Sequence, residues 1–417
     1  MTARDATAPG PTAWTEDAAF VAEVEASLCL RHTPGLGPRT WKRILDRYPT
    51  ATAALAEARH FVAQGLCSAN VATALIQGFP QGLARREMDA AAAKGLTPLP
   101  FSSPFFPARL RELPDPPILL YGIGELSLLC RPSVALVGAR HCSRYGFENA
   151  WHIAAGLSAA GVTVVSGLAF GIDRQAHLGA LTGPGSSVAV LGTGLDLVYP
   201  DANLDVWKEL AAHGAIISEF APGTPPQAQN FPIRNRVIAG LSLGVMVVEA
   251  AARSGSLITA RLALDQGREV FALPGPVTLP TFAGCHTLLA AGATLVQSAD
   301  DILAGLSREL GEALMPARAP SDLPLPPPPA PARQPAPTPP PPVATVPLEG
   351  LEAALFALLA DGERRHIDAL ARELQSASGA ISRALVSLEL KGLVRKWPGM
   401  YYSGEREEHG RPCRKSH

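Results

Sequence analysis

The sequence predicts an α/β protein with a Rossmann-like parallel sheet at its centre, because short apolar runs alternate with helical patterns between residues 131 and 309. Strands that are apolar along their whole length are typical of parallel sheets covered by helices on both faces. Gly138, Gly167 and Gly192 each follow such a run closely. Ligands of these folds bind beyond the carboxyl ends of the strands, where the glycine turns are expected. The expected strands lie at 134–137, 162–165, 187–191, 215–217, 245–249, 269–273 and 294–296.

Hydrophobic spacing and composition divide the chain into four expected segments. A helical domain of the SAM or helix-hairpin-helix type spans 19–95, and the Rossmann-like domain spans 96–310. Prolines near the start of the second domain favour extended chain and turns there. A Pro-rich linker at 311–342, expected to be extended and semi-rigid, leads to a winged-helix domain at 343–403.

In the helical N-terminal part, Gly35 and Gly37 flank Leu36 between two helical patterns. Helix-hairpin-helix turns have this arrangement, and in DNA-binding examples their backbone N–H groups contact phosphates. Arg39 and Lys42 give such a contact only modest support. We therefore favour a tight helix–helix turn without a ligand over a DNA-binding turn.

The C-terminal part shows three helical patterns followed by a hairpin pattern, which is the layout of a winged helix. The third pattern, from Ala377 to Lys391, would be the helix that contacts DNA bases. Its expected outward residues, Ser378, Ser382 and Arg383, carry little positive charge. Base contacts in the major groove normally use Arg, Lys, Asn or Gln. A protein contact or weak DNA binding is therefore favoured over sequence-specific recognition.

Composition argues against several classes of protein. The 417 residues are 47% hydrophobic and carry a net charge of −1, so the chain can bury a sizeable core but has no global basic field. The six cysteines include no CxxC pair, which fits a reducing compartment and argues against a structural zinc or a disulfide framework. Without an apolar leader or a run of ~18 apolar residues, a cytoplasmic protein is expected.

Common nucleotide-binding and catalytic motifs are missing. The turn after Val137 has a single glycine where a dinucleotide fingerprint needs three, and no GxxxxGK[ST] loop is present. NAD and ATP are therefore disfavoured as ligands. Neither a Ser–His–Asp set nor a pair of carboxylates stands out. We expect no catalytic residue, no metal ligand and no cofactor.

Three segments carry residues suited to binding an anion. The turn after the first strand brings a glycine and an arginine that can bind two phosphate oxygens at once. The turn at 166–171 offers small residues and free N–H groups ahead of a helix. The segment 230–236, expected just before a helical run at 237–241, adds cations that suit phosphates spaced along a strand. The candidate residues are Gly138, Arg140, Ser166, Gly167, Phe170, Gly171, Asn230, Phe231, Arg234, Asn235 and Arg236.

Several nearby side chains have structural interpretations. Phe170 can stack on a base or lie buried under its own loop, and the sequence favours neither. Asp173 fits a helix cap or a structural partner better than a catalytic acid. His177 fits a packed residue on the following helix, and Ser254 fits a helix cap.

Together, these motifs resemble the DNA-processing protein A (DprA/Smf) family. The resemblance covers about residues 20–403, and several long motifs in the right order make it specific. The matching segments are 137–140, 164–173, 190–200, 231–242, 248–250 and 254–260.

The resemblance implies a homodimer that binds and protects single-stranded DNA and loads the RecA recombinase onto it during natural transformation. It implies neither a cofactor nor turnover, and the single-stranded-DNA-binding protein would be a further partner. The phosphate pocket would lie at Arg140, 166–173 and 231–236. Positions equivalent to Phe170, Asp201 and Ala228 are often basic in relatives, so this chain is expected to hold DNA with fewer cations.

Two other functions stay open. Phosphoribohydrolases that cleave nucleoside monophosphates have a related fold, but they carry a PGGxGT-type loop where this chain reads ARSGSL at 252–257. That mismatch disfavours the enzyme. A pure adaptor would use the winged helix and the Pro-rich linker to recruit partners without DNA.

Overall fold

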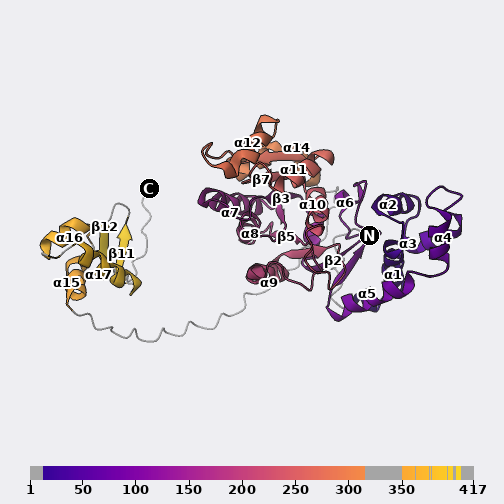
Figure 1. Cartoon of the computed structure of the whole chain (residues 1–417), viewed down its shortest axis with the longest axis horizontal. Helices are drawn as coiled ribbons and strands as arrows, with labels where there is room; N and C mark the ends of the chain where they lie inside the picture. Colours follow the sequence, from indigo (N-terminus) through magenta and orange to yellow (C-terminus); the bar gives the residue numbers. More distant parts are fainter. Residues whose placement is uncertain are drawn as a thin grey trace, which may run out of the picture. The chain divides into compact units, whose positions relative to one another are not determined.

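The structure, a computed structural model, describes residues 13–314, 350–361, 363–374, 376, 378–391, 393–397 and 401–404. The described residues fall into two compact units, which lie within 13–314 and 350–404 (Figure 1). The predicted linker lies outside the described residues from residue 315 onward, whereas its first residues belong to helix α14 (Ser307–Leu314). The boundaries of the four predicted domains stay predictions.

The N-terminal part of the first unit is helical, as the sequence predicts. Asp17 caps the first helix, and its carboxylate accepts hydrogen bonds from the N–H groups of Ala19 and Phe20. In the next turn Gly35 adopts a φ of +84°, and Pro38 occupies the first position of the second helix. The helices are α1 (Ala18–His32), α2 (Pro38–Arg47), α3 (Ala51–Ala56), α4 (Ala69–Ile76) and α5 (Gln81–Ala93), with 3-10 turns at Ala13–Thr15 and Ala58–His60.

A nine-stranded sheet forms the centre of this unit, in the order β1-β2-β6-β5-β4-β3-β7-β8-β9. In the sheet order β6-β5-β4-β3-β7-β8-β9 neighbouring strands pair in parallel, whereas β1 and β6 pair with β2 in antiparallel fashion. The predicted parallel sheet is confirmed, and each expected strand overlaps one of β3 to β9. The strands are β1 (Thr97–Pro100), β2 (Leu119–Gly124), β3 (Ser133–Val137), β4 (Thr163–Ser166), β5 (Ser187–Val190), β6 (Ala215–Ser218), β7 (Gly244–Val247), β8 (Glu269–Ala272) and β9 (Thr294–Leu295).

Strand β1 is not predicted by the sequence, because Pro98 and Pro100 fall within it. Proline lacks the N–H group that a ladder needs, so sheets accept it mainly in edge strands. β1 is the first strand in the sheet order and pairs with β2 alone. Its edge position therefore explains how a proline-containing segment joins the sheet.

The direction in which the sheet grows reverses at β3. The chain adds β4, β5 and β6 on one side of β3, then β7, β8 and β9 on the other. The carboxyl ends of the strands beside such a switch point leave a crevice that commonly holds ligands. The helices between and after the strands are α6 (Ala108–Arg111), α7 (Arg144–Ala159), α8 (Ile172–Ala180), α9 (Leu204–His213), α10 (Asn230–Leu241), α11 (Ser256–Asp265), α12 (Ala283–Ala290) and α13 (Ala299–Gly305), followed by α14.

A buried polar cluster joins the N-terminal helices to the sheet. Arg31 of α1 pairs with Glu87 of α5 and donates a hydrogen bond to the carbonyl oxygen of Glu219, just after β6, at 3.1 Å. The hydroxyl of Tyr121 in β2 donates to Glu87 at 2.7 Å, and Arg236 of α10 pairs with the Glu219 carboxylate. None of these side chains is more than 17% exposed. Because buried charges are stable only when paired, the cluster fixes how the helices pack on the sheet.

The second unit contains the three helices and the hairpin of a winged helix, as predicted. A short strand that the sequence does not predict, β10, joins the hairpin in an antiparallel sheet of order β10-β12-β11. The elements are α15 (Leu351–Leu359), β10 (Arg365–His366), α16 (Ile367–Glu373), α17 (Ser378–Leu390), β11 (Val394–Trp397) and β12 (Tyr401–Gly404). The core is built from fully buried leucines: Leu355, Leu359, Leu370, Leu385 and Leu388.

On the predicted outward face of α17, Arg383 is exposed and Ser382 is half-buried, while the side chain of Ser378 lies outside the described residues. Val386 of the same helix is also exposed. Within the described ranges, no helix combines the length and the apolar character needed to cross a membrane.

Replacing Arg31 with alanine is expected to lower the free energy of unfolding by about 3–5 kcal/mol, because Glu87 then keeps a buried carboxylate without its main cation. Arg85→Ala is the matched control. Arg85 pairs with Glu25 at 3.0 Å but is 69% exposed, and exposed pairs contribute about 0–1 kcal/mol. Urea unfolding followed by tryptophan fluorescence measures both variants, and equal losses would contradict a special role for the buried pair.

Candidate functional site

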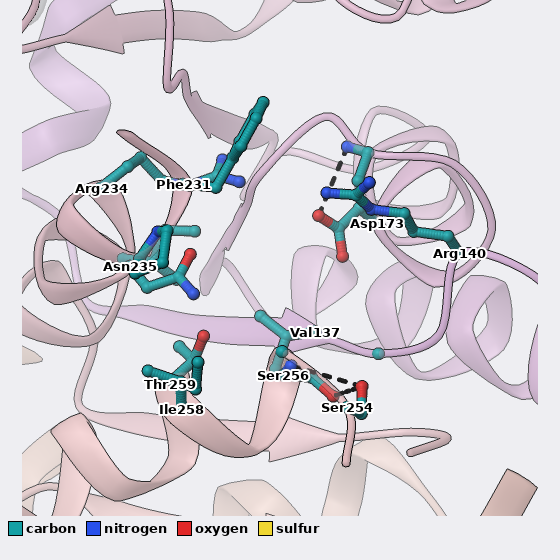
Figure 2. Close-up of a pocket in the computed structure, with 15 residues that line it drawn as sticks. Val137, Arg140, Asp173, Phe231, Arg234, Asn235, Ser254, Ser256, Ile258 and Thr259 are labelled. Atoms are coloured by element: carbon teal, nitrogen blue, oxygen red, sulfur yellow. Dashed lines mark hydrogen bonds between the residues drawn. The ribbon is translucent and has the colours of Figure 1, made fainter. Parts of the chain in front are cut away.

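The turns after β3 and β4 meet helix α10 and the start of α11 around a cavity of about 290 Å³ (Figure 2). This is the predicted place, beyond the carboxyl ends of the strands beside the switch point. A smaller hollow of about 40 Å³ shares its wall at Arg140, Phe231 and Arg234. The predicted residues that line one or both spaces are Gly138, Arg140, Gly167, Phe170, Phe231, Arg234 and Asn235.

The turn after β3 holds Gly138 tightly and leaves Arg140 exposed. A Cβ atom on Gly138 would lie 2.6 Å from Cγ1 of Ile172, so no larger residue fits there. Glu249, fully buried after β7, accepts hydrogen bonds from the backbone N–H and the hydroxyl of Ser143 and thereby anchors the turn. Among the described residues Arg140 forms no ion pair, and its guanidinium carbon lies 5.6 Å from the centre of the Phe231 ring. Arg140 is therefore a cation available to a ligand.

The turn between β4 and α8 is organised by Asp173. Its carboxylate accepts hydrogen bonds from the N–H groups of Gly167, at 3.2 Å, and Ala169, at 3.4 Å. This confirms Asp173 as a structural partner. Burial raises the pKa of Asp173, while the charge of Arg234 and these hydrogen bonds act in the opposite direction. Two backbone N–H groups that could face an anion are thus already used inside the protein.

Two predicted residues of this turn serve its backbone rather than the cavity. Ser166 is fully buried, and its hydroxyl donates to the carbonyl oxygen of Leu136 at 2.7 Å. Gly171 adopts a φ of +69°, and a Cβ atom there would lie 2.4 Å from the carbonyl oxygen of Ala139. Neither lines the cavity or the hollow, so both shape the turn that presents its neighbours.

His177 lies behind the same turn and is a packed, fully buried residue, as predicted. Its Nε2 accepts a hydrogen bond from the N–H group of Leu168 at 3.2 Å, so Nδ1 carries the proton and faces the Ser187 hydroxyl at 2.7 Å. Leu168 has a φ of +56°, which is uncommon outside glycine. Burial, followed by the charge of Arg234, lowers the pKa of His177 to about 3. The neutral imidazole thus supports an unusual backbone conformation.

Arg234 is the buried cation of the site. Its guanidinium donates hydrogen bonds to the carbonyl oxygens of Gly167, at 2.8 Å, and Val190, which ties α10 to the ends of β4 and β5. Burial lowers the pKa of Arg234 to about 10, with Asp173 opposing the shift, so the side chain stays charged at neutral pH. Its Nε atom has no hydrogen-bond partner in the described part of the chain. The residue lines both the cavity and the hollow.

Arg236, the third predicted cation, points elsewhere. The segment expected to precede a helix is itself helical, because α10 already begins at Asn230. Side chains two residues apart on a helix do not share a face. Arg236 therefore pairs with Glu219 and approaches Asp115 at 3.9 Å, and it lines neither space. The structure brings together Arg140 and Arg234 but not the predicted set of three arginines.

Aromatic side chains surround the smaller hollow. Phe231 lies between the guanidinium groups of Arg140 and Arg234 and 5.7 Å from the ring of Tyr199. Phe170 and Tyr199 are 41% and 40% exposed, so Phe170 is not buried under its own loop. Exposed aromatic faces beside a cation are suited to stacking on bases.

The two predicted asparagines differ in position. Asn235 lines the large cavity and is half-buried. Asn230 is buried at the start of α10 and lines neither space, and its Nδ2 atom has no partner within the described residues. Asn230 therefore does not share the cavity wall with Asn235.

The wall opposite the arginines was not among the predicted binding residues. It consists of Ser254, Gly255, Ser256, Ile258 and Thr259, from the turn after β7 and the first residues of α11. The N-cap position of α11 is Gly255, one residue after Ser254. The Ser254 hydroxyl nevertheless accepts a hydrogen bond from the N–H of Ser256, the first residue of α11, at 3.4 Å, and it lies 2.7 Å from the Ser256 hydroxyl. A run of small polar residues between a strand and a helix is the sequence signal that could have identified this wall.

Comparison with known proteins settles the family. A family model described as DNA recombination-mediator protein A matches residues 98–307, and the DprA winged helix domain matches residues 326–400. The chain belongs to the DprA/Smf family. The first match contains every residue that lines the cavity, whereas helices α1 to α5 precede it.

Relatives in the DprA/Smf family share much of the chain. Protein Smf of Synechocystis sp. is 37% identical over 317 residues, which cover 74% of this chain and 79% of the relative. DNA processing protein DprA of Streptococcus pneumoniae is 46% identical over 199 residues, or 48% of this chain and 70% of the relative. The X-ray structure of DprA from Streptococcus pneumoniae matches with a TM-score of 0.59 at 36% identity, covering 66% of this chain and 95% of that chain.

The neutral state of His177 predicts a pH dependence of stability. Its folded pKa, about 3, lies below the ordinary value of 6.5, so the unfolded chain binds this proton first as the pH falls. Between pH 6.5 and 3, His177 alone is expected to lower the free energy of unfolding by about 1.4 kcal/mol per pH unit. His177→Gln removes this dependence. Between pH 6.5 and 5, the slope of its free energy of unfolding against pH should therefore be smaller than that of the wild type by about that amount.

Urea unfolding at pH 7, 6 and 5 measures the slope. His152→Gln, which replaces an exposed histidine, is the control and should keep the slope of the wild type. A His177→Gln slope equal to that of the wild type would show that the imidazole titrates normally in the folded protein.

Proposed function

We propose that this chain binds single-stranded DNA along the carboxyl edge of the sheet, with a phosphate in the cavity beside Arg140 and Arg234. One observation carries this proposal. The exposed Arg140 forms no ion pair among the described residues, and its guanidinium carbon lies 5.6 Å from the centre of the Phe231 ring. A guanidinium can bind two phosphate oxygens, and the ring offers a face to a base. Asn235, Ser254 and Thr259 add polar groups to the cavity wall.

The aromatic hollow favours a single strand over a duplex. Phe170, Tyr199 and Phe231 can stack only on bases whose faces are free, and the bases of a duplex are stacked on one another. The net charge of −1 gives no long-range attraction for a polyanion. Binding is therefore expected to depend on this local set of cations and rings.

The family supports the remaining parts of the proposal. The matched family model is described as a recombination mediator, and relatives are called DNA processing proteins. We propose that the chain delivers bound single-stranded DNA to the RecA recombinase during natural transformation, acts in the cytoplasm as a homodimer and does so without turnover. A contact with the single-stranded-DNA-binding protein belongs to the same proposal.

Arg140→Ala is expected to weaken binding of a labelled oligo-dT about tenfold or more, because charge-assisted hydrogen bonds contribute about 1.5–3 kcal/mol. The slope of log K against log salt should also fall by about 0.7, the value for one lost phosphate contact on a single strand. Fluorescence anisotropy at several salt concentrations measures both quantities.

Arg144→Ala is the matched control for this experiment. Arg144 lies four residues further along, is 91% exposed, pairs with Glu148 and lines neither space. It should leave affinity and slope unchanged. Equal effects of the two substitutions would mean that Arg140 acts only through overall charge, and an unaffected Arg140→Ala would remove the phosphate site from this cavity.

A phosphoribohydrolase is the second candidate function, favoured by one observation. The cavity of about 290 Å³ ends at small polar residues before the ten-residue helix α11, a place suited to one phosphate. We expect no release of free base when the protein is incubated with a panel of nucleoside monophosphates and the products are separated by chromatography. If the wild type released free base and Arg140→Ala did not, the phosphoribohydrolase would become the favoured function.

A further inference from the structure

A second large cavity lies among the N-terminal helices, and none of its lining residues belongs to the site described above. Its volume is about 310 Å³, within the roughly 300–1,000 Å³ of ligand pockets. The lining comes from α1, α3, the 3-10 turn at 58–60, α4 and the start of α5. Leu55, Leu75, Ile76 and Pro80 make much of it apolar, and Arg59 adds a cation. Such a space accepts a bulky apolar side chain.

Apolar side chains are exposed next to this cavity. Ile76, at the end of α4, lines the cavity and is nevertheless 61% exposed, and Phe79, in the following turn, is 62% exposed. Leu83 on the first turns of α5 is a third exposed apolar residue. Single exposed apolar residues are ordinary, but several beside a cavity are typical of a protein-binding surface.

The lining of the cavity carries one charged side chain, the cation of Arg59. From Ala58 to Arg86 the sequence has no acidic residue, whereas Arg59, Arg85 and Arg86 are exposed. Arg85 is paired with Glu25, and Glu57 is paired with His60. In the part of the chain that the structure describes, Arg59 and Arg86 form no ion pair. Arg59 is therefore the cation in the lining that a carboxylate of a partner can reach.

We propose that this face binds an acidic, amphipathic peptide segment of a partner protein. The segment inserts a bulky apolar side chain into the cavity, covers Ile76 and Phe79, and places a carboxylate beside Arg59. Helical segments commonly bind hydrophobic grooves in this way, with charge complementarity fixing their orientation.

A nucleic acid fits this face less well than a peptide. Phosphates would pair with the arginines, but they would leave the apolar cavity unfilled and the side chains of Ile76 and Phe79 without an apolar partner. The proposal is independent of the single-stranded DNA site, because the two cavities share no lining residue.

Three labelled 15-residue helical peptides test the proposal on the full-length protein. The first carries Phe and Leu on one face and Glu on the other, the second has Lys for each Glu, and the third has Ala for each Phe and Leu. Fluorescence anisotropy should show the first peptide binding at least tenfold more tightly than the other two. Absence of binding by the first peptide, or equal binding of the first two, would overturn the proposal.

Variants of the protein locate the binding face. Ile76→Glu places a carboxylate at the mouth of the cavity and should therefore weaken binding of the first peptide at least tenfold. Arg59→Glu should weaken binding of this peptide as well. Leu264→Glu makes the same kind of change at a 59% exposed leucine of α11 and should leave peptide binding unchanged.

Binding of oligo-dT by Ile76→Glu should equal that of the wild type, which shows that the variant is folded and separates this surface from the DNA site. Unchanged peptide binding by Ile76→Glu would overturn the proposal. A second result would also overturn it: the wild type does not bind the peptide, and Arg59→Glu binds oligo-dT more weakly than the wild type does. The face would then be a nucleic-acid surface.

Discussion

The candidate site depends on one buried cation, the guanidinium of Arg234. It holds the ends of β4 and β5 against α10 through the carbonyl oxygens of Gly167 and Val190. At 5% exposure a charge needs compensation, and the nearby carboxylate of Asp173 supplies it. The same charge helps to keep His177 neutral, so that its Nε2 can accept the N–H group that holds the turn. Position 167 must also be glycine, because a Cβ atom there would lie 2.3 Å from the guanidinium.

This arrangement divides the two arginines by their energetic roles. The desolvation of Arg234 is complete once the chain has folded, and its bonds to carbonyl oxygens fix its position before any ligand arrives. Arg140 is exposed, so a ligand that binds it must displace water and restrict the side chain. The Phe231 ring lies against both guanidinium groups, 5.6 Å and 6.0 Å from its centre, and so couples the fixed cation to the free one. A site that combines one fixed cation with one adaptable cation is suited to a flexible polymer whose phosphates do not arrive in one fixed geometry.

The sheet could be predicted because strands buried on both faces must be apolar throughout, and that pattern is visible in the sequence. The position of the site followed, since the glycine turns mark the carboxyl ends of those strands. The face of each side chain could not be predicted where the start of a helix was misjudged. With α10 beginning at Asn230 rather than near Val237, Arg234 faces the cavity and Arg236 faces Glu219. Ser166, the last residue of β4, is fully buried, and the sequence does not show which way it faces because the last residue of a strand can face the core as readily as a ligand.

The aromatic hollow bears on how the proposed ligand would be held. Phe170 occupies a position where the family resemblance led us to expect a basic residue in relatives, and its ring is 41% exposed. A ring in place of a cation removes a phosphate contact and adds a stacking contact. The phosphate contact weakens as the salt concentration rises, whereas the stacking contact depends little on salt. Near the cavity the charges of Arg140 and Arg234 are offset in part by Asp173, so the local excess of positive charge is small. A single strand bound here would accordingly owe more of its affinity to its bases, and less to its phosphates, than in relatives with a basic turn.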